Sequence, residues 1–222
     1  MQIVDMEKQG RKKHFDWFNS FTDPTFTINV RIDVTNVVRH AKAHNKSFFI
    51  ELLYLVTEAL HSVPEMRMRI KGEDVVIFDS LNPSYTIMTE SGNFDNCRHQ
   101  MTHDYQTFYA RAAGAIAETK AGTRKKTYFN DLSIVDDFYI TSVPWVDFSA
   151  VTHPQPTWSK ENMSIPRICW GKYTESDGKF SLTLNLAANH ALVDGYPLSQ
   201  VAVHLQTLLD KVSVDTPDLP AW

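Results

Sequence analysis

The spacing of apolar residues along the chain predicts a mixture of strands and helices. Short runs that alternate apolar and polar residues, or that are apolar and bounded by turn residues, predict strands. These runs cover residues 26–34, 66–70, 74–79, 84–89, 137–143, 165–173 and 180–188. Apolar residues spaced near 3.6 positions predict helices over residues 9–19, 36–44, 48–60 and 103–121 and after Gly195.

Capping and turn residues mark the ends of several of these elements. Ser47 is expected to cap the helix over residues 48–60. That helix is apolar on nearly every face, so we expect it at the centre of the core. Thr35 or Asn36 is expected to cap the helix before it. Pro83 is expected to break the chain ahead of the next strand.

The order of the elements indicates an α/β fold of the two-layer α+β kind. Strands and helices are mixed without regular alternation, and turns at residues 71–73 and 176–178 join two pairs of strands as hairpins. The length of 222 residues suits one large core, and no repeat, low-complexity tract or linker divides the chain. We therefore expect a single domain over residues 1–222, built as a large mixed β-sheet with helices packed on one side.

Composition and charge exclude several classes of protein. Hydrophobic residues make up 43% of the chain, which is enough for a buried core. The net charge of -4 and the lack of a long basic run argue against nucleic acid or an anionic membrane as partners. The charged N-terminus does not resemble a signal peptide, and no apolar run is long enough to span a bilayer. Cys97 and Cys169 do not form the framework of a small secreted domain, so we expect a cytoplasmic protein.

A histidine follows the predicted strand over residues 180–188. His190 lies where the apolar run stops, four residues before Asp194. Histidine titrates near neutral pH, so this position suits a general base, although a histidine here also fits a structural role. Farther back in the chain, Cys97, His99 and His103 lie close together, but their spacing does not match the common structural zinc patterns, and we expect no metal.

Several short motifs follow one another along the chain. They are Arg11 with His14-Phe15, Glu65-Met66-Arg67-Met68-Arg69-Ile70, Asp79-Ser80, Pro144-Trp145-Val146-Asp147-Phe148, Gly171-Lys172-Tyr173 and Asn189-His190-Ala191-Leu192-Val193-Asp194-Gly195-Tyr196. In order and spacing they resemble the chloramphenicol acetyltransferase family. This family consists of trimeric, acetyl-CoA-dependent enzymes related in fold to the catalytic domains of dihydrolipoyl acyltransferases. The resemblance covers nearly the whole chain.

The resemblance implies a reaction and roles for individual residues. His190 is similar to the family's general base, which takes the proton of an acceptor hydroxyl as that oxygen attacks the thioester carbonyl of acetyl-CoA. Asp194 and Arg11 resemble an ion pair that holds the histidine loop without touching the base. The acceptor is a small hydroxylated molecule, and chloramphenicol is its leading representative. The resemblance thus implies an acetyltransferase of the antibiotic-resistance type.

The resemblance also implies a homotrimer with its active site between subunits, the histidine from one subunit and much of the acceptor pocket from its neighbour. Four phenylalanines are then expected walls for an aromatic acceptor: Phe18, Phe26, Phe94 and Phe138. Each of them also fits a role in core packing. Lys172 and Tyr173 lie in the region associated with CoA.

Two positions depart from the family's pattern where the oxyanion of the tetrahedral intermediate is bound. Ala150 replaces a serine that donates a hydrogen bond, and Ser149 could substitute for it only through a bulge or a one-residue shift. Cys169 replaces a threonine and is a poorer donor. Two alternatives follow: a catalytically weakened trimer that binds CoA or a small molecule, and an acetyltransferase for a different acceptor. Transfer to a lipoyl group is disfavoured, because no lipoyl-bearing region or linker precedes the domain.

Overall fold

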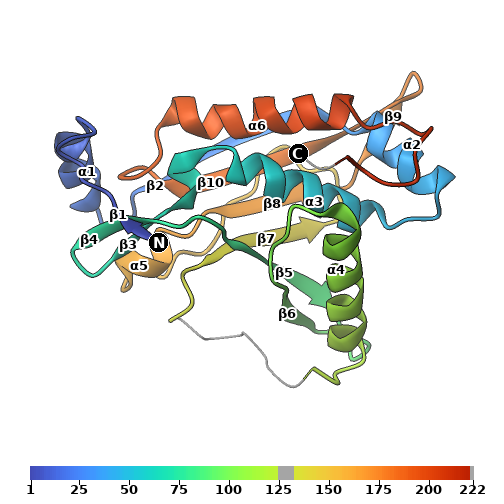
Figure 1. Cartoon of the computed structure of the whole chain (residues 1–222), viewed down its shortest axis with the longest axis horizontal. Helices are drawn as coiled ribbons and strands as arrows, with labels where there is room; N and C mark the ends of the chain where they lie inside the picture. The colour runs from blue at the N-terminus through green and yellow to red at the C-terminus, as the bar shows by residue number, and fades with distance from the viewer. Residues whose placement is uncertain (125–132, 221–222) are drawn as a thin grey trace.

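The computed structural model of the protein describes residues 1–124 and 133–220. Within these ranges, a mixed sheet of seven strands runs through the molecule (Figure 1). Its order is β2 (Thr25–Asp33), β10 (Lys179–Asn189), β8 (Arg167–Gly171), β7 (Asp137–Val143), β5 (Asn82–Met88) and β6 (Phe94–Arg98), and β9 (Thr174–Ser176) pairs with β10. The strand β7 runs parallel to β5 and β8, and the other pairs are antiparallel.

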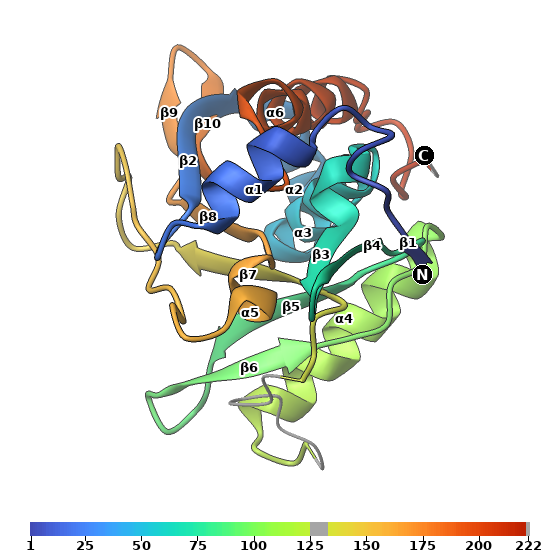
Figure 2. The same cartoon turned by 90° about the vertical axis from the view of Figure 1, so that its left-hand side faces the viewer.

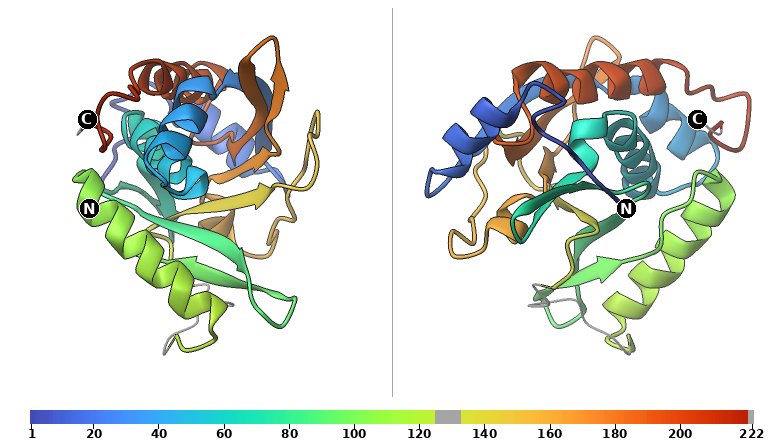
Figure 3. Two further views of the ribbon diagram at one scale, coloured as in Figure 1. Left: turned by 90° about the vertical axis from the view of Figure 1, so that its right-hand side faces the viewer. Right: turned by 60° about the vertical axis from the view of Figure 1, so that its left-hand side comes forward.

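Helices cover one face of this sheet (Figure 2, Figure 3). The helix α3 (Phe48–His61) lies at the centre, in contact with α2 (Thr35–Ala43), α4 (Tyr105–Lys120) and α6 (Gly195–Asp210). Twelve of the 14 residues of α3 are buried, because its apolar side chains leave no face suited to solvent. The predicted large mixed sheet with helices on one side is therefore confirmed.

Smaller elements surround this two-layer body. The strands β1 (Gln2–Ile3), β4 (Asp74–Ile77) and β3 (Met68–Lys71) form a second sheet, next to the 3-10 helix η1 (Pro64–Arg67). The helix α1 (Lys12–Asn19) lies at the end of the large sheet where β2 begins, and α5 (Lys160–Met163) precedes β8 (Figure 1). Among the helices of the described residues, none is long and apolar enough to cross a lipid bilayer.

Most of the predicted elements are confirmed, and the corrections concern their ends. Ser47 caps α3, its hydroxyl accepting a hydrogen bond from the N–H of Ile50. The predicted cap of α2 at Thr35 or Asn36 is wrong, because the helix already begins at Thr35, where the Asp33 carboxylate accepts the N–H of Thr35 at 2.8 Å.

The predicted chain break at Pro83 is also wrong, because β5 runs through it. Pro83 pairs with Phe138 of the parallel strand β7. On its other side, pairing with β6 starts only at Ser84, so the missing N–H of the proline costs no hydrogen bond there. The strand β6 was not predicted, because its sequence lacks a regular apolar alternation.

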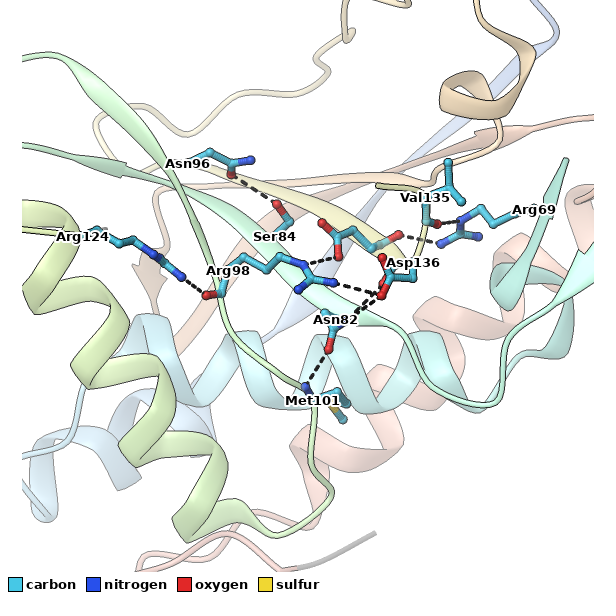
Figure 4. Close-up of polar contacts among 10 residues, drawn as sticks. Arg69, Asn82, Ser84, Asn96, Arg98, Met101, Arg124, Val135 and Asp136 are labelled. Atoms are coloured by element: carbon cyan, nitrogen blue, oxygen red, sulfur yellow. Dashed lines mark hydrogen bonds and ion pairs between the residues drawn. The ribbon is translucent and has the colours of Figure 1, made fainter. Parts of the chain in front are cut away.

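Two arginines hold the chain segment before β7 through their side chains (Figure 4). Arg69 is fully buried and donates hydrogen bonds to four backbone carbonyl oxygens, those of Met66, Met68, Val135 and Asp137. Arg98 pairs with the carboxylates of Asp136 at 3.0 Å and Asp137 at 2.7 Å. The burial of Arg69 and the partial burial of Arg98 are tolerated because hydrogen-bond acceptors surround each guanidinium group.

Candidate active site

His190 is presented by a tight turn at the end of β10. The N–H of His190 donates to the carbonyl oxygen of Pro24 at 2.8 Å, which ties the turn to the start of β2. The side-chain oxygen of Asn189 accepts the N–H of Ala191 at 2.9 Å. The backbone on both sides of the histidine is therefore held by hydrogen bonds.

Two phenylalanines hold the His190 ring from the side of α1 and β2. The Phe18 ring stacks flat on it, with centroids 3.9 Å apart and an interplanar angle of 7°. The Phe26 ring lies at 4.9 Å with an angle of 38°. The His190 side chain keeps 27% of its surface exposed. Phe18 and Phe26 thus lie beside the histidine of their own chain and restrict its orientation.

A carboxylate faces the buried nitrogen of the same ring. The Oδ1 atom of Asp194 lies 3.4 Å from Nδ1 of His190, close enough for a charge interaction, yet Nδ1 has no aligned hydrogen bond. This contact differs from the expected separation of Asp194 from the base. The carboxylate favours a proton on Nδ1, so that Nε2 is left as a proton acceptor on the exposed side of the ring.

Arg11 holds this carboxylate with two hydrogen bonds. One of its terminal nitrogens lies 3.1 Å from Oδ1 of Asp194, and the other donates to Oδ2. The hydrogen bond from Arg11 is the main cause of a lowered pKa for Asp194, which therefore stays ionised. The structure brings together the two members of the expected ion pair, which are 183 positions apart in the sequence.

Ser149 and Ala150 lie in a loop that is anchored some distance along the sheet from His190. Both are exposed, in a loop that is anchored to the middle of the sheet. Asp147 pairs with Arg31 at 2.6 Å, and the carbonyl oxygen of Val151 accepts the side-chain amide of Asn185 at 2.9 Å. Asn185 precedes His190 by five residues of a β-strand, or about 17 Å. The anchor of this loop is therefore separated from the base of the same chain by about this length of strand.

Gly171 allows the bend before this loop to pack closely on β8. A Cβ atom at Gly171 would lie 3.0 Å from the carbonyl oxygen of Val146 and 3.2 Å from the Phe148 ring. The N–H of Lys172 donates to the same Val146 oxygen at 2.9 Å. Lys172 itself is exposed, and the Tyr173 ring packs edge-on against Phe48 of α3. The two residues expected near CoA therefore follow directly on the packed bend.

The remaining expected residues divide between the core and an open cleft. Cys169 is buried in β8 opposite Asn185, and burial raises the pKa of its thiol to about 11. Phe138 is fully buried, edge-on to the ring of His61 in α3. Phe94 is 56% exposed and borders a cleft of about 380 Å³ on the sheet. Phe138 thus lies in the core of this chain, whereas Phe94 lies at a surface that a ligand can reach.

Sequence reasoning missed the polar residues of this cleft, above all His153 and Arg167. It also missed Trp17, which is 64% exposed beside Phe18. Arg167 stands next to Ile168 in a predicted strand that is otherwise largely apolar, and a charge at such a position was the available indication. The expectation of no metal concerned Cys97, His99 and His103. Two of them hydrogen-bond to residues outside this group: His99 to the Tyr85 hydroxyl and His103 to the Glu58 carboxylate.

The family's sequence model matches residues 1–206 under the description chloramphenicol acetyltransferase. The chain belongs to the chloramphenicol acetyltransferase family. It is therefore an enzyme of the acyltransferase class. A chloramphenicol acetyltransferase of Proteus mirabilis is 27% identical over 210 residues, covering 94% of each chain. One of Bacillus pumilus is 25% identical, covering 92% of this chain and 91% of its own.

Solved structures give the same result for the fold. A chloramphenicol acetyltransferase structure matches with a TM-score of 0.84 at 26% identity, covering 94% of this chain and 99% of its own. A probable dihydrolipoamide acetyltransferase of Listeria monocytogenes matches with a TM-score of 0.69 at 14% identity, covering 98% and 97%. At that identity the second match shows a common fold alone. Together they confirm the expected relation in fold to the dihydrolipoyl acyltransferases.

Proposed function

We propose that this protein is an acetyl-CoA-dependent O-acetyltransferase that uses His190 as a general base on the hydroxyl of a small molecule. The geometry of the His190 ring carries the proposal. Stacking on Phe18 restricts the ring, Nδ1 faces the Asp194 carboxylate, and Nε2 lies on the exposed side. A base held in one tautomer is ready to accept a proton without first reorganising.

The reaction follows from this arrangement in two proton transfers. Nε2 of His190 takes the hydroxyl proton while the acceptor oxygen forms a bond to the thioester carbonyl carbon of acetyl-CoA. The resulting imidazolium is stabilised by the Asp194 carboxylate at 3.4 Å from Nδ1. The carbon–sulfur bond then breaks, and the CoA thiolate takes the proton back from the imidazolium. The products are the acetyl ester and free CoA, without an acyl-enzyme.

We place the active site between subunits of a homotrimer. The support is the separation of about 17 Å along β10 between His190 and Asn185, which anchors the loop with Ser149 and Ala150. If this loop takes part in the reaction, the histidine that it meets must belong to another copy of the chain. A closed ring of three identical copies repeats such a contact at every interface.

Acetyl-CoA is the co-substrate in this proposal, with Lys172 and Tyr173 as its expected contacts. The exposed Lys172 ammonium is free of any ion pair among the described residues and suits the negatively charged end of CoA. Hydrogen bonding of the Lys172 backbone to Val146 fixes its position beside the bend.

The test is the release of CoA thiol from acetyl-CoA, first with chloramphenicol and then with a panel of primary and secondary alcohols. We expect His190→Ala to lower the rate by about 10² to 10⁴. The matched control is His204→Ala. His204 lies in α6 and shares a hydrogen bond with the Ser62 hydroxyl after α3, away from the site. If no tested acceptor gives thiol release, or if the release survives His190→Ala, the proposal is refuted.

The trimeric site is tested by mixing two inactive subunits. His190→Ala removes the base, and Ala150→Trp obstructs the acceptor side of the neighbouring subunit. In trimers assembled at random from both variants, one interface in four combines an intact base with an intact loop. We therefore expect about a quarter of the wild-type activity to return. A site built within one chain would return none.

A second candidate function is a trimer of the same fold that binds its ligands but has weakened activity. The observation in its favour is the absence of a hydroxyl donor at Ala150 and the buried, poorly donating thiol of Cys169. Loss of one oxyanion donor costs about 10² to 10³ in rate. CoA binding by calorimetry without turnover, and no gain from Ala150→Ser, would favour this second function.

A further inference from the structure

The cleft beside Phe94 is lined by basic, neutral polar and apolar side chains. Its volume of about 380 Å³ suits a small molecule, and it is lined by residues of β5, β6, β7, β8 and the loop after β7. The described residues that line it include no aspartate or glutamate, whereas Arg167 and His153 are basic. Ser84 and Asn96, which hydrogen-bond each other at 3.3 Å, add neutral polar groups to its wall (Figure 4).

Arg167 is a buried guanidinium group without an anion. Its surface is 8% exposed, and its one hydrogen bond among the described residues goes to the Ile165 carbonyl at 3.1 Å. The Tyr139 ring lies 5.5 Å from its Cζ atom. No carboxylate of the described residues lies within ion-pair distance, and the charge of Asp23 acts on it only from farther away. Burial lowers the pKa of Arg167, as expected for a cation that lacks a partner.

The buried Arg69 and the half-buried Arg98 show how this chain satisfies a guanidinium that has only a structural role. Arg69 uses four backbone carbonyls, and Arg98 uses two carboxylates. Arg167 has neither arrangement, and it borders an open cleft instead of closed packing. A buried charge with so little compensation is costly for the fold, and an anionic ligand would remove that cost.

His153 gives the cleft a second polar side chain. The amide of Asn185 donates to the Val151 carbonyl, so its Oδ1 atom faces His153 and accepts a hydrogen bond from Nε2 at 3.0 Å. The ring is thereby fixed. Burial lowers the pKa of His153, so the ring is favoured neutral and its Nδ1 atom is a hydrogen-bond acceptor that suits a hydroxyl group. Arg167 and His153 come from β8 and from the loop that also carries Ala150, so the cleft adjoins the loop of the proposed active site.

We infer that this cleft receives an acceptor molecule that carries a carboxylate, with the two carboxylate oxygens bound by the Arg167 guanidinium. The inference rests on the proposed acetyltransferase function and narrows its acceptor to a hydroxylated organic acid. A planar carboxylate matches the paired N–H groups of arginine, and such charge-assisted pairs are strong when solvent is excluded. Chloramphenicol, a neutral molecule, leaves this guanidinium without an anion and is expected to be a poor acceptor.

A matched pair of acceptors tests the inference with the wild-type protein. The two compounds are 4-(hydroxymethyl)benzoate and 4-(hydroxymethyl)benzamide, which share the reacting hydroxyl and differ in charge. We expect kcat/KM to be about 10-fold or more higher for the benzoate. Arg167→Gln should abolish the preference, and Arg167→Lys should retain part of it. Arg39→Gln is the control, since Arg39 is an exposed arginine whose guanidinium donates to the Gly178 carbonyl, away from the cleft. Equal use of the two compounds by the wild type would overturn the inference, whether or not the variants fold.

Calorimetric binding of the same two compounds separates this inference from the proposed function. Binding of the benzoate that depends on Arg167, without thiol release by any acceptor, would refute the acetyltransferase and leave the anion site standing. Turnover of neutral alcohols with no preferential binding of the benzoate would refute the anion site and leave the acetyltransferase standing.

Discussion

The contact between Asp194 and His190 leads to a prediction that can be worked out in detail. Asp194→Asn keeps the size of the side chain and removes its charge. In the wild type, that charge lies 3.4 Å from Nδ1, the nitrogen of His190 that faces away from the acceptor. The negative charge matters most when the ring becomes an imidazolium during the reaction, so its loss should raise the barrier more than it weakens substrate binding.

The magnitude follows from Coulomb's law. Two unit charges at this distance interact by about 5 kcal/mol at an effective dielectric constant of 20 and by about 1 kcal/mol at 80. The lower value applies, because the two side chains are 27% and 35% exposed and Arg11 already neutralises much of the carboxylate charge. One kcal/mol corresponds to about fivefold in rate. An asparagine amide that donates to Nδ1 would favour the wrong tautomer and add to this loss.

The assay is steady-state thiol release with the best acceptor, comparing wild type, Asp194→Asn, Arg11→Gln and the double variant. We expect kcat to fall at least fivefold in Asp194→Asn with KM nearly unchanged. The double variant should lose less than the product of the two single losses, because both act through one ion pair. A folded Asp194→Asn protein with a kcat within twofold of the wild type would refute the assignment of Asp194 as the positioning residue for His190.

Three further predictions concern packing and pH. Gly171→Ala should destabilise the protein by about 1 to 3 kcal/mol and lower activity, since its methyl group would press on Phe148; unchanged denaturant midpoint and activity would contradict it. Phe138→Ala should cost about 3 to 5 kcal/mol of unfolding free energy without changing acceptor preference, because Phe138 lies in the core; altered preference at full stability would make it a pocket wall. Burial raises the pKa of Glu51 from 4.5 to about 7, so the folded state binds the proton more tightly than the unfolded state. Stability from this group is present below pH 4.5 and is lost as the pH rises through 7. In urea unfolding between these two pH values, the wild type should lose up to about 3 kcal/mol of unfolding free energy relative to Glu51→Gln. A difference between the two proteins that does not change with pH would contradict this prediction.

The sequence predicted the elements that depend on neighbouring residues. The apolar spacing of α3 and its cap at Ser47 are local properties, and both were confirmed. The predicted strand over residues 84–89 starts too late, because β5 already begins at Asn82. A proline breaks a strand only where its nitrogen would have donated to a partner. Whether such a partner exists is decided by the sheet order, which the local pattern does not contain.

The site divides in the same way. Motif order by itself singled out His190, Arg11 and Asp194, because the resemblance preserves the spacing of residues that act together. Only the tertiary structure decided that Asp194 contacts the His190 ring and that Arg167 borders a cleft without a carboxylate partner among the described residues. It also decided that the loop with Ala150 is anchored at Asn185, about five residues of strand before His190. The alternation of a strand shows that its residues have two faces, but what covers each face depends on chain segments far away in the sequence.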